Sequence, residues 1–212
     1  MLRSLVLADF ITLTNAACGT AAIFCCLNHM DVAGRACADA TSLLAQCVDS
    51  TWLWMAFALL PMAFIADALD GFVARKGRRK SPYGGDLDSL ADTISFGVAP
   101  AVIAFTLGIR GVWDAALLVY FVACGIARLA RFNATADDLA DERGKVSHFE
   151  GTPIPTSLFF VLVLFIAWRL GAVGDALWLG ELRLLGGGFH PMVVLFAISG
   201  SLMISRVRIP KP

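Results

Sequence analysis

The chain has 212 residues, of which 58% are hydrophobic and only 16% are charged, and its 17 basic residues balance its 17 acidic residues. A soluble core of this size cannot bury so much apolar surface, so the composition indicates an integral membrane protein. The balanced charge gives no basic footprint for nucleic acid, and the six cysteines include no C-x-x-C pair of the kind that binds zinc.

The first apolar segment, Ala8–Met30, continues beyond any plausible signal-peptide cleavage point and therefore predicts a membrane-spanning helix. A polar patch, Thr12-x-Thr14-Asn15-x3-Gly19, lies inside it. From the residues alone, such a patch fits hydrogen bonding to a neighbouring helix, with a close contact at the glycine.

A polar loop, residues 31–50, follows the first helix and contains Cys37 and Cys47. These two cysteines are candidates for a disulfide if the loop lies outside the cytosol. Trp52 and Trp54 then open the second helix, as expected for aromatic residues at a membrane interface.

Four carboxylates then recur at helical spacing. Asp67 and Asp70 stand three residues apart, and Asp88 and Asp92 four apart, so each pair occupies one face of a helix. One carboxylate at the bilayer centre costs about 2.5–3.5 kcal/mol, and clustered anions repel one another, so we expect a cation between them. Carboxylate oxygens suit Mg²⁺ or Mn²⁺, and Mg²⁺ usually keeps positions open for substrate phosphates. The stretch therefore predicts a metal site that handles phosphates.

Small and basic residues follow the first pair of carboxylates. Gly71 and Ala74 lie on the stripe that this pair defines and leave room for a ligand, while the planar fork of donors on Arg75 suits a diphosphate. The basic run over residues 75–80 predicts the cytoplasmic side of the membrane. It serves either as an anchor alone or to attract anionic lipid or the diphosphate.

Two further helices are expected next, at Asp86–Ile109 and Ala115–Asn133. The second of them ends with Arg128 and Arg131, which share a face because they stand three residues apart. They either mark the cytoplasmic end of the helix, as basic residues commonly do, or bind an anionic group on an acceptor molecule.

Apolar segments at Ile154–Trp168 and His190–Ile204 complete an expected all-α membrane domain of six transmembrane helices over residues 1–212. No internal repeat or second domain is visible. Thirteen of the 17 basic residues fall on the side of the acidic stretch, and the other four are Arg35, Arg110, Arg169 and Arg183. The positive-inside rule therefore predicts that the acidic stretch and both termini face the cytoplasm.

The pattern Asp67-x-x-Asp70-Gly71-x-x-Ala74-Arg75-x8-Gly84-x3-Asp88-x3-Asp92 resembles, without a departure, the signature of the CDP-alcohol phosphotransferases. The resemblance implies a membrane enzyme that uses Mg²⁺ or Mn²⁺ to displace CMP from a CDP-activated alcohol by the hydroxyl group of a second alcohol. It implies that the catalytic base is Asp92 and that all four carboxylates hold metal. The residues it implies for the CDP-lipid are Asn15, Thr12, Gly71, Ala74, Arg75 and Ser81.

Longer stretches, among them Asp88–Pro100 and Arg128–Asn133, resemble the phosphatidylserine synthase branch of this family, and the end of the chain resembles its fungal-type members. This resemblance implies CDP-diacylglycerol and L-serine as substrates in a lipid membrane, the endoplasmic reticulum as location, and a homodimer. A zwitterionic acceptor needs a cation for its carboxylate. The candidates for binding serine are, in order, Arg131 and Arg128, followed by Phe132, Asn133 and Ser95.

Other functions remain open on the residues alone. Inositol or glycerol 3-phosphate are alternative acceptors, although a phosphorylated acceptor calls for a denser basic pocket than two arginines. A divalent-metal transporter is the alternative from another class, but transporters commonly carry inverted repeats and place carboxylates near the bilayer midplane. A regulatory membrane protein with an inactive site is the third possibility.

Overall fold

The computed structural model describes residues 6–38, 43–76, 83–135, 148–184, 186–205 and 208–210. Ser81 and the side chains of Cys37 and Cys47 lie outside this description, so the disulfide and the contact of Ser81 with the CDP-lipid stay predictions.

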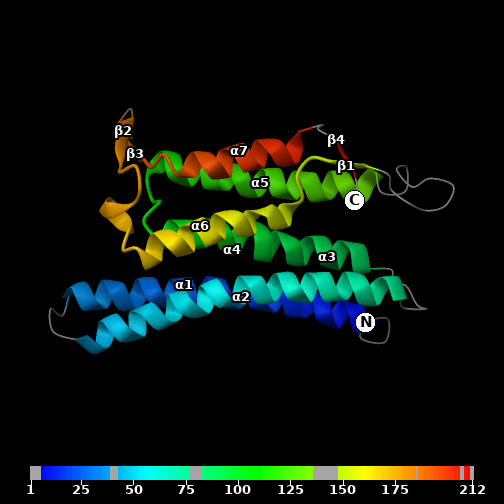
Figure 1. Ribbon diagram of the computed structural model, residues 1–212, viewed down its shortest axis with the longest axis horizontal. Helices are drawn as coiled ribbons and strands as arrows, with labels where there is room; N and C mark the ends of the chain where they lie inside the picture. Colours follow the sequence, from blue (N-terminus) through cyan, green and yellow to red (C-terminus); the bar gives the residue numbers. More distant parts are fainter. Residues whose placement is uncertain are drawn as a thin grey trace.

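Helices make up most of the described chain (Figure 1). The α-helices are α1 (Leu7–Ala38), α2 (Leu43–Lys76), α3 (Gly84–Asp92), α4 (Ala99–Thr106), α5 (Val112–Thr135), α6 (Ser157–Arg169) and α7 (Val193–Ile204). A π-helical turn, Thr93–Val98, joins α3 to α4 without a break, so the three pieces act as one helix. Short 3₁₀ turns occupy Ile154–Thr156 and Gly174–Ala176.

Four helices in the described residues are long and apolar enough to cross a membrane: Leu7–Arg35, Ser50–Arg75, Gly84–Thr106 and Val112–Ala134. The prediction of a helical membrane protein is confirmed at this level. The two remaining predicted segments also form helices, but α6 has 13 residues and α7 has 12. Both are shorter than the roughly 20 residues that a perpendicular span requires.

The helices lie side by side along the long axis of the molecule (Figure 1). α1 and α2 form one layer, α3, α4 and α6 lie in the middle, and α5 and α7 form the opposite layer. α1 packs extensively against α2, and small residues of both helices, such as Ala22, Ala56 and Ala63, are fully buried. Small side chains let helix backbones approach closely, which is the main source of packing energy between helices in a membrane.

Hydrogen bonds to a buried carboxylate hold the end of the bundle where α5 begins. Asp114 is fully buried, and its carboxylate accepts hydrogen bonds from the backbone N–H groups of His190 and Gly111 at 2.7 and 2.8 Å. The His190 ring lies 2.6 Å from the same carboxylate. These contacts fix the segment before α7 to the start of α5, next to the hairpin of β2 (Leu182–Leu184) and β3 (Gly187–Phe189).

A second antiparallel pair lies at the opposite end of the bundle (Figure 1). β1 (His148–Glu150) pairs with β4 (Arg208–Pro210), with Phe149 opposite Ile209. The pair ties the segment before α6 to the segment after α7. It lies at the end where α2 and α5 finish and α3 begins, which is also the end nearest the acidic residues.

Candidate active site

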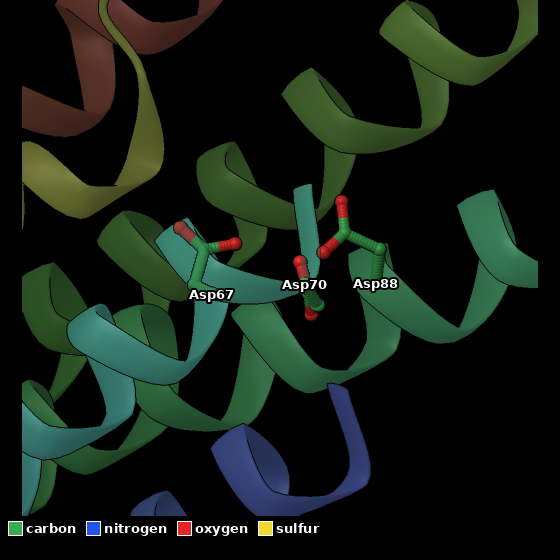
Figure 2. A group of neighbouring side chains, drawn as sticks. All are labelled: Asp67, Asp70 and Asp88. Atoms are coloured by element: carbon green, nitrogen blue, oxygen red, sulfur yellow. The ribbon is translucent and has the colours of Figure 1, made fainter. Parts of the chain in front are cut away.

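Three carboxylates from two helices converge near one end of the bundle. Figure 2 shows Asp67 and Asp70 on α2 beside Asp88 on α3. One carboxylate oxygen from each of the three lies within 4.8 Å of the others. The spacing argument predicted one face for each pair, and α1, which packs against both α2 and α3, holds Asp88 of the second pair close to the first pair.

The donor atoms of this group fit a hard divalent cation. One oxygen of Asp70, a residue only 5% exposed, accepts a hydrogen bond from the Thr12 hydroxyl at 2.6 Å. The Oδ1 atom of Asp88 is buried and has no hydrogen-bond partner. A buried oxygen without a donor is costly unless a cation or a ligand satisfies it. Three carboxylates with such an orphaned oxygen therefore match the oxygen ligands that Mg²⁺ and Mn²⁺ prefer.

The fourth carboxylate has a different environment. Asp92 is 7% exposed and lies outside the group of three. Its Oδ1 atom accepts a hydrogen bond from the side-chain amide of Asn15 at 3.2 Å. The Oδ1 atom of Asn15 is itself buried without a partner, so this amide retains an acceptor for a ligand. Thr12 and Asn15, predicted near the CDP-lipid, thus each hold one of the carboxylates.

Close packing of α1 against the π-helical turn fixes Asn15. The Ser95 hydroxyl donates to the backbone carbonyl of Asn15 at 2.9 Å, and Ser95 is fully buried. A Cβ atom on Gly19 would lie 2.4 Å from the Ser95 hydroxyl oxygen and 2.7 Å from its Cα atom, so only glycine fits there. Ser95 lies in the contact between α1 and the π-helical turn, and its role in shaping the serine pocket stays a prediction.

The residues predicted around the diphosphate lie toward the end of α2. Ala74 and Arg75 are exposed, and Gly71 is partly buried. A Cβ atom on Gly71 would come within 3.5 Å of an Arg75 guanidinium nitrogen, so the arginine side chain folds back along the helix toward the acidic group. The contact of Arg75 with a diphosphate stays a prediction.

The two arginines of α5 have different surroundings. Arg128 lies near enough to Asp92 for their opposite charges to attract, and its guanidinium carbon lies 5.7 Å from the centre of the Phe132 ring. Arg131 donates to three backbone carbonyls at the end of α7, at 3.2, 3.5 and 3.4 Å. Those carbonyls belong to Ile204, Met203 and Ser205. Which of the two binds the carboxylate of an acceptor stays a prediction.

Asn133 forms a contact that the sequence did not indicate. Its side-chain amide donates to the Ser89 hydroxyl at 2.9 Å, which links the end of α5 to α3. Ser89 follows Asp88 directly, so the pair braces the helix that carries two of the carboxylates. No feature of the sequence distinguishes Ser89 from an ordinary exposed serine, because its partner lies 44 residues away.

Together, the helices and the acidic group define a class: a helical membrane protein with converging carboxylates suited to a divalent cation and a phosphate ligand. The chain belongs to the CDP-alcohol phosphatidyltransferase family, whose family model matches residues 5–199. The resemblance in the sequence is thereby confirmed.

Curated relatives give a finer comparison. The chain is 42% identical over 218 residues to the CDP-diacylglycerol–serine O-phosphatidyltransferase of Saccharomyces cerevisiae, covering 100% of this chain and 73% of the yeast protein. It is 33% identical to the protein of the same name from Methanocaldococcus jannaschii, over 81% of this chain and 68% of the relative. The protein of that name from Mycobacterium leprae is 43% identical over 55% of this chain and 40% of its own length.

Proposed function

We propose that this protein transfers the phosphatidyl group of CDP-diacylglycerol to the hydroxyl group of L-serine, giving phosphatidylserine and CMP. The observation that carries the proposal is the full family signature, three of whose carboxylates converge in one acidic group, in a chain that aligns over its whole length with the yeast serine enzyme. The acceptor is proposed from the relatives' names, and the chemistry from the site.

The mechanism assigns separate tasks to the carboxylates. A divalent cation held by Asp67, Asp70 and Asp88 would neutralise charge on the diphosphate and on the departing CMP. Asp92 accepts the proton as the serine oxygen forms its bond to the lipid-attached phosphorus and the bond from that phosphorus to the CMP oxygen breaks. Because Asn15 occupies one oxygen of Asp92, the other oxygen is available for the proton.

Arg128 is the proposed partner of the serine carboxylate, ahead of Arg131. We expect Arg128→Gln to raise the KM for serine about tenfold or more, because a charge-assisted hydrogen bond contributes about 1.5–3 kcal/mol. Arg131→Gln is the matched control. It removes hydrogen bonds to the end of α7, so it should lower the thermal stability in detergent and raise the KM for serine less. If Arg131→Gln raised the KM for serine more than Arg128→Gln did, Arg131 would be the better candidate for binding the serine carboxylate.

The membrane arrangement is part of the proposal. We assign six membrane segments, with α6 and α7 as the two short ones, both termini and the acidic site in the cytoplasm, and the endoplasmic reticulum as the location. The excess of basic residues on the side of the acidic site supports this orientation. A homodimer is proposed from the family alone.

The acceptor can be tested with purified protein in detergent. CMP release is measured with CDP-diacylglycerol and Mn²⁺ or Mg²⁺, while L-serine, inositol and glycerol 3-phosphate are supplied in turn. Release that depends on serine supports the proposal. Release with another alcohol would keep the phosphotransferase chemistry and reject the acceptor. If folded protein releases no CMP with any of them, a metal transporter or an inactive site becomes the better explanation.

A further inference from the structure

An apolar groove lies between α2 and α6. Its volume is about 300 Å³, and the residues that line it all come from these two helices. On each helix the lining residues recur at every third or fourth position, so the groove follows one face of each helix. They include Trp54, Phe57 and Pro61 on α2, and Leu158, Leu162 and Phe165 on α6.

Aromatic contacts between the two helices fix the walls of the groove. The centre of the Phe165 ring lies 5.3 Å from that of the Trp54 ring and 5.2 Å from that of the Phe57 ring. Both pairs meet edge to face, which is a favourable arrangement for aromatic rings. These contacts set the distance between α2 and α6, so the groove has a defined width.

A guanidinium group lies at one end of the groove. Arg169 is the last residue of α6, and it continues the stripe of lining residues because it follows Phe165 by four positions. The residue is exposed, and its guanidinium carbon lies 5.2 Å from the centre of the Trp54 ring. Within the part of the chain that the structure describes, no carboxylate forms an ion pair with it. Its charge is therefore accessible to an anion at this end of the groove.

The groove is separate from the acidic site. Pro61 is the lining residue nearest to the carboxylates along α2, and it precedes Asp67 by six residues, or about 9 Å of helix. α6 ends, at Arg169, on the side of the bundle where α5 begins, opposite the end nearest the acidic residues (Figure 1). In the proposed membrane arrangement this side faces away from the cytoplasm.

We propose that the groove binds a phospholipid of the non-cytoplasmic leaflet, with the lipid phosphate on Arg169 and one acyl chain between α2 and α6. α2 is long enough to cross the membrane, so a groove along it lies at the depth of the hydrocarbon, and an acyl chain matches its apolar lining. The planar fork of donors on arginine suits a phosphate group. The inference goes beyond the proposed reaction and depends only on α2 and α6 lying in the membrane.

The charged end of the groove can be tested by native mass spectrometry. The full chain, freed of lipid in detergent and loaded with one equivalent of CDP-diacylglycerol, is titrated with dioleoylphosphatidylglycerol. We expect one molecule of the probe to bind in addition to the substrate. Arg169→Gln should weaken this binding about tenfold, as the loss of a charge-assisted hydrogen bond does, and Arg169→Lys should weaken it less. Arg183→Gln, which removes an exposed arginine of β2, should leave it unchanged.

A matched pair of variants on α6 tests the acyl chain. Leu162 lines the groove and is 54% exposed, whereas Ile166 is 43% exposed and does not line it. Leu162→Trp fills the groove and should weaken binding of the probe at least tenfold, while Ile166→Trp should leave it unchanged. Dioleoylglycerol, which has the chains without the phosphate, and inorganic phosphate should each bind the wild type at least tenfold more weakly.

Three results would overturn the inference. Equal affinities in the wild type, Arg169→Gln and Leu162→Trp would reject the lipid site. If the protein loaded with CDP-diacylglycerol bound no probe, the groove would hold a chain of the substrate itself. A dimer that dissociates in Leu162→Trp would make the groove a contact between two copies. A protein that binds the probe as expected but releases no CMP with serine keeps this inference and rejects the proposed reaction.

Discussion

Replacing Asp88 by Asn is expected to lower the rate of CMP release about a thousandfold, because metal-ion stabilisation of transition-state charge contributes several kcal/mol. Asp88 carries the buried oxygen that has no donor, and it is the one member of the group of three that comes from α3. The asparagine amide has one neutral oxygen, whereas the aspartate carboxylate has two oxygens that share a negative charge. The substitution therefore removes the negative charge and weakens the one ligand that α3 supplies to the cation. The rate should be measured at saturating CDP-diacylglycerol over a range of Mn²⁺ concentrations.

Asp86 provides the control on the same helix. It lies in the first turn of α3, is exposed, and is not part of the acidic group. Asp86→Asn removes the same charge two residues away and should leave both the rate and the metal dependence close to wild type. Equal losses in the two variants would mean that the effect is one of general negative charge near the membrane, and the assignment of Asp88 as a ligand would be wrong.

Asp92→Asn should reduce kcat about 10²- to 10⁴-fold, the usual contribution of a positioned general base. The KM for CDP-diacylglycerol and the concentration of Mn²⁺ that gives half-maximal rate should change little, since Asp92 lies outside the group of three and is bound to Asn15. Steady-state kinetics with each substrate varied separately would measure these quantities.

The metal requirement should distinguish Asp92→Asn from Asp88→Asn. Should Asp92→Asn shift the metal requirement as strongly as Asp88→Asn does, Asp92 would be a metal ligand, as the family resemblance also implied, and the proton would need another acceptor. A parallel loss of kcat and of affinity for CDP-diacylglycerol would also argue against the role of base.

Local rules predicted the parts of the site that depend on one helix. The three- and four-residue spacing of the carboxylates determines their shared faces, because helical periodicity is a local property of the backbone. The hydroxyl of Thr12 and the amide of Asn15 were also recognisable as polar groups out of place in an apolar helix. Their partners, 58 and 77 residues away, depend on how α1 packs and were not predictable.

The remaining features depend on tertiary packing. Sequence reasoning placed Arg131 ahead of Arg128 as the partner of serine. In the fold, Arg131 donates to backbone carbonyls at the end of α7 and Arg128 lies within electrostatic reach of Asp92, and for this reason the proposed order is reversed. The π-helical turn at Thr93–Val98 shifts the register of the residues that follow Asp92, and no spacing rule anticipates a change of helical period. Ser95 has a polar side chain that could bind a ligand, yet it is fully buried between helices, and the sequence does not reveal that burial.

Transfer of labelled serine into lipid tests the central claim most directly. Purified protein is incubated with CDP-diacylglycerol and isotopically labelled L-serine, with Mn²⁺ or with excess chelator, and the lipid product and CMP are quantified together. The account predicts labelled phosphatidylserine and CMP in equal amounts with the metal and neither with the chelator. Phosphatidylserine formed at the same rate in chelator, or CMP released without labelled lipid, would contradict it.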